Sequence, residues 1–273
     1  MVSPVTENNT ATTLRLIDSH CHVHDTEFFA DNREELYQQT IAAGIGMICV
    51  GTDERSSRQA VEFAASRDYT WAAVGVHPHD SKDGWGEVER LLKARAEDSP
   101  IVAIGEIGLD YYYDHSPRDV QIQALEAQLQ LAVDYNLPVS FHVRDGTAGQ
   151  VSVWDDFWPI FDNFHSLRGV LHSFTDTRLN LDKGFARGLY VGLNGISTFT
   201  KDQVQQELFA SIPLERLLLE TDAPFLTPKP FRGKMNMPRY VELVAKYWAD
   251  NRNIPFDDLS EATVRNTKNL FGI

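Results

Sequence analysis

The stretch Leu14-Arg15-Leu16-Ile17-Asp18-Ser19-His20-Cys21-His22 begins as an apolar run and ends in two histidines. Alternate side chains of a strand point to the same face, so His20 and His22 can bind one metal ion from one side. Two neighbouring histidines are also common on surface loops, where they bind nothing. The stretch therefore predicts a metal site only if further ligands come from elsewhere in the chain.

Short apolar runs like this one recur along the whole chain. Each is rich in Val, Ile and Leu and nearly unbroken, as expected for parallel strands that are buried on both faces. The predicted strands are residues 14–17, 46–50, 71–76, 101–104, 138–143, 169–171, 189–193 and 217–219.

Segments with helical spacing lie between these runs. The clearest follows Pro117, where Ile122, Leu125 and Leu129 line one helix face. The segment 151–165 is less regular because Pro159 interrupts it. The other predicted helices are residues 33–43, 55–66, 86–97, 176–187, 202–211 and 237–250.

Strands that alternate with helices favour right-handed βαβ units and a parallel sheet. Eight units predict an α/β fold, a closed (β/α)8 TIM barrel that forms a single domain over residues 14–273. A doubly wound open sheet is the alternative. No Gly-x-Gly-x-x-Gly fingerprint follows the first strand, which disfavours dinucleotide binding. Residues 1–13 are predicted to be a flexible N-terminal extension.

Composition limits the function classes. The 273 residues are 42% hydrophobic, enough for one large core. No apolar run approaches the ~20 residues of a membrane span, and the N-terminus does not resemble a secretory signal. Two cysteines, Cys21 and Cys49, disfavour a disulfide scaffold and indicate a cytoplasmic protein. The formal charge of −14 argues against a broadly basic nucleic-acid surface, so a phosphate group would be held locally.

Histidines and carboxylates gather where the predicted strands end, the position at which (β/α)8 enzymes place their active sites. Imidazoles and carboxylates without thiolates suit Zn²⁺, Mn²⁺ or Fe²⁺. Four histidines and two acids exceed what one tetrahedral ion needs, whereas two ions sharing a carboxylate would use them all. The polar residues at the strand ends are His20, His22, His77, Glu106, His142, Arg144, His172 and Asp222.

Seven motifs follow the strands in order: Asp18-Ser19-His20-Cys21-His22, Gly75-Val76-His77-Pro78, Gly105-Glu106-Ile107-Gly108-Leu109-Asp110-Tyr111, His142-Val143-Arg144-Asp145, Leu171-His172-Ser173-Phe174, Glu220-Thr221-Asp222-Ala223-Pro224, and Arg232-Gly233-Lys234 with Asn236. Over residues 14–272 the chain resembles the TatD family of metal-dependent deoxyribonucleases, which belongs to the amidohydrolase-like (β/α)8 metal hydrolases.

The resemblance implies a nuclease that hydrolyses phosphodiester bonds in DNA catabolism, as a 3′–5′ exonuclease acting on single-stranded DNA or 3′ ends. It implies two divalent ions per subunit (Zn²⁺, Mn²⁺ or Mg²⁺) and no obligate protein partner. One ion would be held by His20, His22, Glu106 and Asp222. The second would be held by Glu106, which bridges, with His142 and His172.

Asp222 and Glu106 are the predicted catalytic residues. Asp222 would orient or deprotonate the attacking water, and a buried Glu106 needs a metal or cation as partner. Arg144 is predicted to bind substrate phosphate through its fork of donors, with an ion pair to Asp145 as the alternative. His77 is predicted to line the site and touch substrate, with ordering of the next turn as the alternative.

The chain departs from the family pattern at His24, where an apolar residue is more usual, and in the stretch 146–156. The tyrosines that follow the Glu106 motif would stack on bases or pack, with packing favoured for at least two of Tyr111, Tyr112 and Tyr113. The other histidines are expected at the surface or around the ligands: His24, His79, His115 and His165.

Two other functions remain open. The same two-metal site would also hydrolyse an amide, ester or lactone of a small molecule, which the acidic charge slightly favours. A non-enzymatic barrel would use its metals structurally or bind a partner through its acidic surface. Six candidate ligands argue against this last interpretation, because a barrel core needs no metal to fold.

Overall fold

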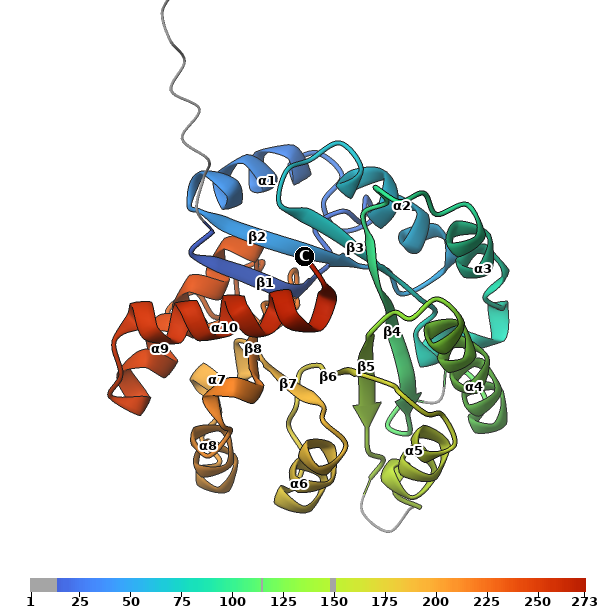
Figure 1. The fold of residues 1–273 in the computed structure, drawn as a ribbon. Helices are drawn as coiled ribbons and strands as arrows, with labels where there is room; N and C mark the ends of the chain where they lie inside the picture. The colour runs from blue at the N-terminus through green and yellow to red at the C-terminus, as the bar shows by residue number, and fades with distance from the viewer. Residues whose placement is uncertain (1–13, 114, 148–150) are drawn as a thin grey trace, which may run out of the picture.

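The chain folds into a ring of eight parallel strands surrounded by helices (Figure 1), seen in a computed structural model that describes residues 14–113, 115–147 and 151–273. The predicted extension, residues 1–13, lies outside the described residues. The strands follow one another around the sheet in chain order: β1 (Leu16–Cys21), β2 (Ile45–Val50), β3 (Thr70–Val74), β4 (Ile101–Asp110), β5 (Val139–Arg144), β6 (Gly169–Leu171), β7 (Tyr190–Leu193) and β8 (Leu217–Leu219).

The last strand returns to the first, which confirms the predicted barrel and excludes the open sheet. Cys21 and Ala223 form a parallel bridge across the seam. The backbone N–H of Asp222 donates to the carbonyl of His20 at 2.8 Å, and that of His22 donates to the carbonyl of Ala223 at 2.8 Å. These bonds place the ends of β1 and β8 side by side.

Helices cover the outside of the ring. The predicted helices are present with ends shifted by a few residues, and short 3-10 turns η1 (Pro78–Asp83), η2 (Leu214–Arg216) and η3 (Pro238–Tyr240) join some of them. The helices are α1 (Arg33–Ala42), α2 (Glu54–Ala64), α3 (Gly86–Lys93), α4 (Arg118–Asp134), α5 (Val153–Asp162), α6 (Arg178–Ala186), α7 (Ile196–Phe199), α8 (Gln203–Ala210), α9 (Val241–Arg252) and α10 (Phe256–Phe271).

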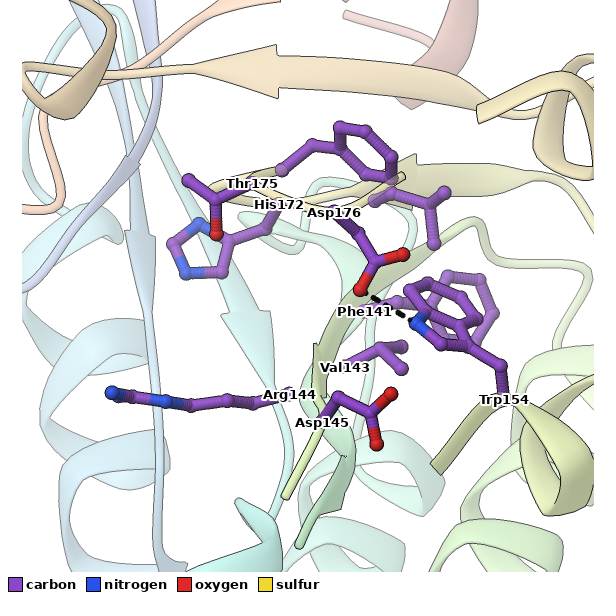
Figure 2. A pocket seen from close by; sticks show the side chains of 10 residues that line it. Phe141, Val143, Arg144, Asp145, Trp154, His172, Thr175 and Asp176 are labelled. Atoms are coloured by element: carbon purple, nitrogen blue, oxygen red, sulfur yellow. Dashed lines mark hydrogen bonds between the residues drawn. The ribbon is translucent and has the colours of Figure 1, made fainter. Parts of the chain in front are cut away.

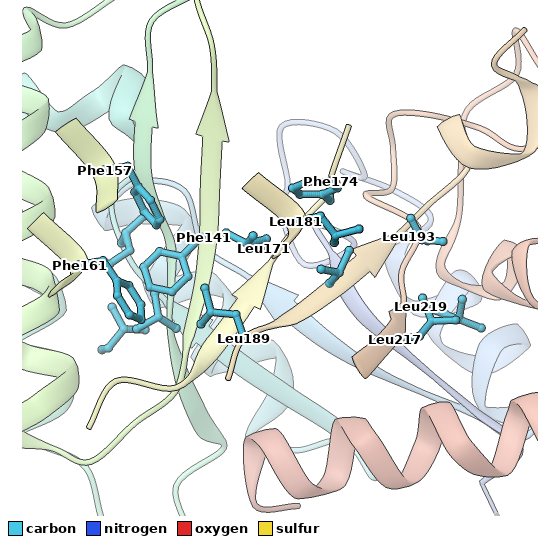
Figure 3. Packing of buried hydrophobic residues seen from close by; sticks show 14 of the residues in the cluster. Phe141, Phe157, Phe161, Leu171, Phe174, Leu181, Leu189, Leu193, Leu217 and Leu219 are labelled. Atoms are coloured by element: carbon cyan, nitrogen blue, oxygen red, sulfur yellow. The ribbon is translucent and has the colours of Figure 1, made fainter. Parts of the chain in front are cut away.

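Pro159 does not end α5, although its ring removes a backbone donor. The helix persists because it buries an aromatic face against the barrel. The Phe157 and Phe161 rings lie 5.3 and 5.7 Å from that of Phe141 on β5 (Figure 3). Packing therefore outweighs the local preference against proline.

The C-terminal helix α10 was not predicted from the sequence. Its last turn places Leu270 and Phe271 in one cluster with Ile48, Val50 and other buried residues of the strands. Strands β1 and β4 also extend beyond the predicted runs, because their polar ends point into the barrel and find partners there. None of the helices among the described residues is long and apolar enough to cross a membrane.

Gly108 permits the close approach of β4 and β5. Its φ is +155°, and a Cβ atom there would lie 1.7 Å from the carbonyl oxygen of His142.

We expect Gly108→Ala to lower the free energy of unfolding by about 3 kcal/mol or more, or to prevent folding. Urea denaturation followed by circular dichroism measures this. Gly86→Ala is the matched control, because a Cβ there meets only Glu54 Oε1 at 3.6 Å; an equal loss in both variants would contradict the argument.

Candidate metal centre

Successive side chains of a strand point to opposite faces, and the polar ones at the strand ends point into the barrel. On β5, Phe141 packs outward against α5, while Ser140 and His142 point inward. On β4 the register shifts between Ile104 and Ile107. A register shift changes the face to which the following side chains point. Glu106 lies within this shift and points inward.

Glu106 lies at the centre of the inward-facing polar groups. Its Oε1 lies 2.9 Å from Nδ1 of His142, 3.4 Å from Nε2 of His172 and 3.7 Å from Nε2 of His77. Its Oε2 lies 3.3 Å from Nε2 of His20. One buried carboxylate therefore faces four imidazoles from four strands or strand ends.

The imidazoles keep this carboxylate charged. Burial by itself raises the pKa of Glu106, but His172, His20 and His142 outweigh burial and hold the pKa well below its usual range. Burial lowers the pKa of His172, whereas Glu220 and Glu106 raise it more, to about 10. The two carboxylates thus stabilise a positive charge at His172, whereas burial lowers the pKa of His20 and of His77, which keeps these two rings neutral.

Asp222, which follows β8, faces two histidines at the end of the neighbouring strand β1. Its Oδ1 lies 3.3 Å from Nε2 of His22 and 3.8 Å from Nε2 of His20. The backbone of Asp222 is left-handed, with φ at +58°, a strained conformation that aspartate tolerates better than most residues. Burial raises its pKa, but the hydrogen bond to His22 and the charge of His172 lower it below the usual value, so Asp222 is ionised.

Outer contacts set which nitrogen of each ring is available. Nδ1 of His22 donates to the carbonyl of Val50 at 2.7 Å, which directs its Nε2 toward Asp222. Nδ1 of His172 lies 3.1 Å from Oε1 of Glu220 without a well-aligned hydrogen bond, and its Nε2 is directed at Glu106.

The arrangement fits a divalent metal. Three groups of ligand atoms lie within 4.8 Å of one another: His20 with His22 and Asp222, His20 with Glu106 and His172, and His77 with Glu106 and His142. Nε2 of His20 is buried and has no hydrogen-bond partner among the described residues, although two carboxylates lie near it. Imidazole nitrogens and carboxylate oxygens that converge on a common point, one of them without a partner in the described chain, are what a cation needs.

All six predicted ligands meet at this centre, and their donor atoms form overlapping groups. His172 lies with His20, and the two rings stack at a centroid distance of 3.6 Å. His142 lies with His77, which was expected only to touch substrate. Glu106 belongs to two of the three groups, the position that a bridging ligand occupies.

Arg144 lies at the edge of the centre and forms no ion pair with Asp145 in the described parts of the chain. Asp145 instead accepts hydrogen bonds from Ser152 and from the backbone of Val153, at 2.8 and 2.9 Å. The guanidinium of Arg144 lies over the rings of Tyr112 and Tyr113. The ion-pair alternative is therefore wrong.

A pocket of about 230 Å³ opens beside the centre, between the ends of β5 and β6. Figure 2 shows His172 and Thr175 on one side of it and Arg144 and Asp145 on the other. Trp154 closes its far end and donates to Asp176 at 2.8 Å. The pocket gives the ligand cluster open space beside His172.

Sequence reasoning assigned no role to four buried residues that hold the ligands. Asp18 accepts from the backbone and the hydroxyl of Thr221, at 2.8 and 2.5 Å, and ties β1 to β8. Asn236 donates to the carbonyl of Thr221 at 2.8 Å. Asp110 contacts His142, and Glu220 contacts His172. These residues lie inside or beside apolar runs of the sequence. Such positions indicate burial, and buried polar groups need partners.

Of the predictions for the tyrosines and the other histidines, some are confirmed and one is wrong. Only Tyr111 is buried, so the expectation that at least two of the three tyrosines pack in the interior is wrong. His24 is fully buried near His22, with a ring distance of 6.4 Å. His79 contacts Asp110, and His115 and His165 are exposed. Cys21 is buried among Met47 and other residues outside the ring, away from the histidines as predicted.

We expect divalent cations to stabilise the metal-free protein. At a free concentration a hundred times its dissociation constant, an ion that binds only the folded chain adds about 2.7 kcal/mol, roughly 5–10 °C in melting temperature. Glu106→Gln should remove most of this shift because Glu106 serves two ligand groups. His165→Gln, at an exposed histidine, is the control. Equal shifts in both variants, measured by differential scanning fluorimetry after chelation and reloading, would place cation binding elsewhere.

Comparison with known proteins agrees with the fold and identifies the family. The family described as TatD related DNase matches residues 17–272. The chain is 34% identical over 258 residues to the uncharacterized metal-dependent hydrolase YabD of Bacillus subtilis, covering 94% of this chain and 99% of that protein. It is 36% identical over 253 residues to the 3′–5′ ssDNA/RNA exonuclease TatD of Escherichia fergusonii, covering 90% and 95%.

Among solved structures, the TatD homolog YjjV of Escherichia coli K12 superposes with a TM-score of 0.84 at 28% identity, covering 95% of this chain and 98% of that one. The family match spans nearly the whole barrel, so the resemblance carried by the seven motifs is confirmed. The chain is a metal-dependent hydrolase and belongs to the TatD related DNase family.

Proposed function

We propose that this protein is a two-metal 3′–5′ exonuclease that hydrolyses phosphodiester bonds of single-stranded DNA. The observation that carries the proposal is Glu106, one buried carboxylate shared by two groups of ligand atoms. A relative of 36% identity bears the name of a 3′–5′ ssDNA/RNA exonuclease, which supports the substrate class and the direction of cutting.

In this proposal His20, His22 and Asp222 hold the first ion together with Glu106, and His142 and His172 hold the second, with Glu106 bridging. The two oxygens of Glu106 support two positions. Oε2 faces His20 at 3.3 Å, whereas Oε1 faces His142 at 2.9 Å and His172 at 3.4 Å. His77 lies 3.7 Å from Glu106 and belongs to the third group. It is therefore close enough to contact a substrate oxygen beside the second ion.

Divalent ions in such a site lower the pKa of water and neutralise charge on the phosphate. The chain supplies the remaining chemistry. Asp222 is ionised and accepts the proton of the attacking water. Arg144 has no carboxylate partner among the described residues, so its donors are available to a phosphate oxygen. Glu220 and the carbonyl of Val50 hold the rings of His172 and His22 in place.

The proposal includes a cytoplasmic location and action without an obligate protein partner. Cys21 and Cys49 are both free and buried, which suits a reducing compartment. The ligand set comes entirely from one chain, so a second subunit is not needed to complete it.

We expect His142→Ala to reduce hydrolysis of single-stranded oligonucleotides by more than about a hundredfold, because it removes a ligand that contacts both Glu106 and Asp110. Purified protein is chelated, reloaded with Mg²⁺, Mn²⁺ or Zn²⁺, and assayed by gel electrophoresis. His165→Ala serves as the control for loss of an exposed histidine.

Oligonucleotides labelled at the 5′ end should shorten stepwise, whereas a label at the 3′ end should appear at once as a mononucleotide. A panel of small esters, lactones and amides run beside DNA tests the small-molecule alternative. Hydrolysis of DNA that survives both chelation and His142→Ala would refute the mechanism, and turnover of the panel without turnover of DNA would refute the substrate.

A further inference from the structure

Four Phe and Tyr side chains are exposed in the described parts of the chain, and all four lie near the ligand cluster. Their exposed fractions are 49% for Tyr112, 41% for Tyr113, 39% for Phe28 and 46% for Phe225. The other described Phe, Tyr and Trp side chains are buried or half-buried. Large apolar rings are costly to leave in water, so their confinement to one end of the barrel indicates a binding role.

The four rings form two pairs on opposite sides of the barrel mouth. Phe28 follows β1 and Phe225 follows β8, and their ring centroids lie 5.2 Å apart. Tyr112 and Tyr113 follow β4, with centroids 4.8 Å apart. In a ring of eight strands in chain order, the β8–β1 seam and the β4–β5 junction are half a turn apart. The ligand cluster lies between the two pairs.

The tyrosine pair is fixed relative to the ligands. Oδ1 of Asp110 accepts the backbone N–H groups of Tyr112 and Tyr113, each at 2.9 Å. Oδ2 of the same carboxylate contacts Nε2 of His142 at 2.9 Å. Asp110 therefore ties the backbone below both rings to a metal-ligand histidine.

Arg144 completes the tyrosine side. Its guanidinium lies 4.4 Å from the ring centroid of Tyr112 and 4.8 Å from that of Tyr113. A flat cation against aromatic rings forms a surface on which a further planar group can stack. The ring of Tyr113 also stacks on that of His115, at a centroid distance of 5.7 Å, so the more exposed Tyr112 is the main platform for such a group.

The phenylalanine pair is fixed in a similar way. The ring of Phe225 lies 6.3 Å from that of His22, and the backbone N–H of Phe225 donates to the carbonyl of Asp222 at 2.8 Å. Asn236 donates to the carbonyl of Phe225 at 2.6 Å. Phe225 is thus bonded to the ligand Asp222, and Phe28 is held by packing against Phe225.

We propose that the two aromatic pairs stack on nucleobases on either side of the scissile phosphodiester bond. This inference rests on the proposed function and adds what holds the strand in place. Stacking on rings is sequence-tolerant and needs no basic surface, which suits a chain of net charge −14. It also requires unpaired bases, so the same geometry selects single strands.

The test combines protein variants that lack the aromatic rings with DNA substrates that lack bases. The variants are Tyr112→Ala/Tyr113→Ala and Phe28→Ala/Phe225→Ala, and the control is Val204→Ala, an exposed apolar residue on the outer helix α8. The substrates are a single-stranded oligonucleotide and the same oligonucleotide with abasic sites at its two 3′-terminal positions. Melting temperatures confirm that the exposed substitutions leave the fold intact.

We expect each double variant to lose about fivefold or more in kcat/KM on the intact strand and less than about twofold on the abasic strand, where wild-type activity is already reduced. The control should match wild type on both strands. Losses of equal size on the two strands, or no loss on the intact one, would overturn the inference and leave the exonuclease proposal standing.

If the wild-type protein hydrolyses neither strand, the exonuclease proposal is refuted. A measurement of DNA binding then tests the stacking inference separately. Fluorescence anisotropy of labelled strands with the chelated protein then decides the inference alone. At least about fivefold tighter binding of the intact strand, lost in both double variants, supports it. Equal affinity for intact and abasic strands refutes it.

Discussion

A buried carboxylate surrounded by imidazoles is the constraint on which the rest of this structure depends. Glu106 is almost inaccessible to water and faces His20, His77, His142 and His172. An isolated charge in that position would be strongly unfavourable. The four rings make it tolerable only if each is held at the correct angle, so the surrounding contacts serve the geometry of this one group.

The seam between β1 and β8 provides half of that geometry. Asp18 binds Thr221 through backbone and hydroxyl, and Asn236 binds the carbonyl of Thr221 from the following loop. These bonds bring His20 and Asp222 together although they are about two hundred positions apart in the chain. Because the hydrogen bonds are buried, breaking one leaves an unsatisfied group, which makes the seam resistant to local opening.

Carboxylates outside the ligand cluster have a second role, because they connect the cluster to the surface. Asp110 contacts His142 and His79 with one oxygen and orders the Tyr112–Tyr113 backbone with the other. In the proposed function, an acidic protein acts on DNA through local features. The divalent ions that the ligands hold neutralise the phosphate and the exposed rings stack on bases, so a broadly basic surface is unnecessary.

The barrel and most helix positions could be predicted from the sequence, because apolar runs and the polar residues that end them are local patterns, and the family resemblance supplied the six proposed ligands. The distances between these ligands follow from the fold. The register shifts in β1 and β4 place His20 and Glu106 inside the ring, and His77 joins His142 there. Only the tertiary structure decided that α5 survives Pro159 and that Tyr112 and Tyr113 stay exposed. These outcomes depend on packing between segments distant in the chain, which periodicity along one segment does not encode.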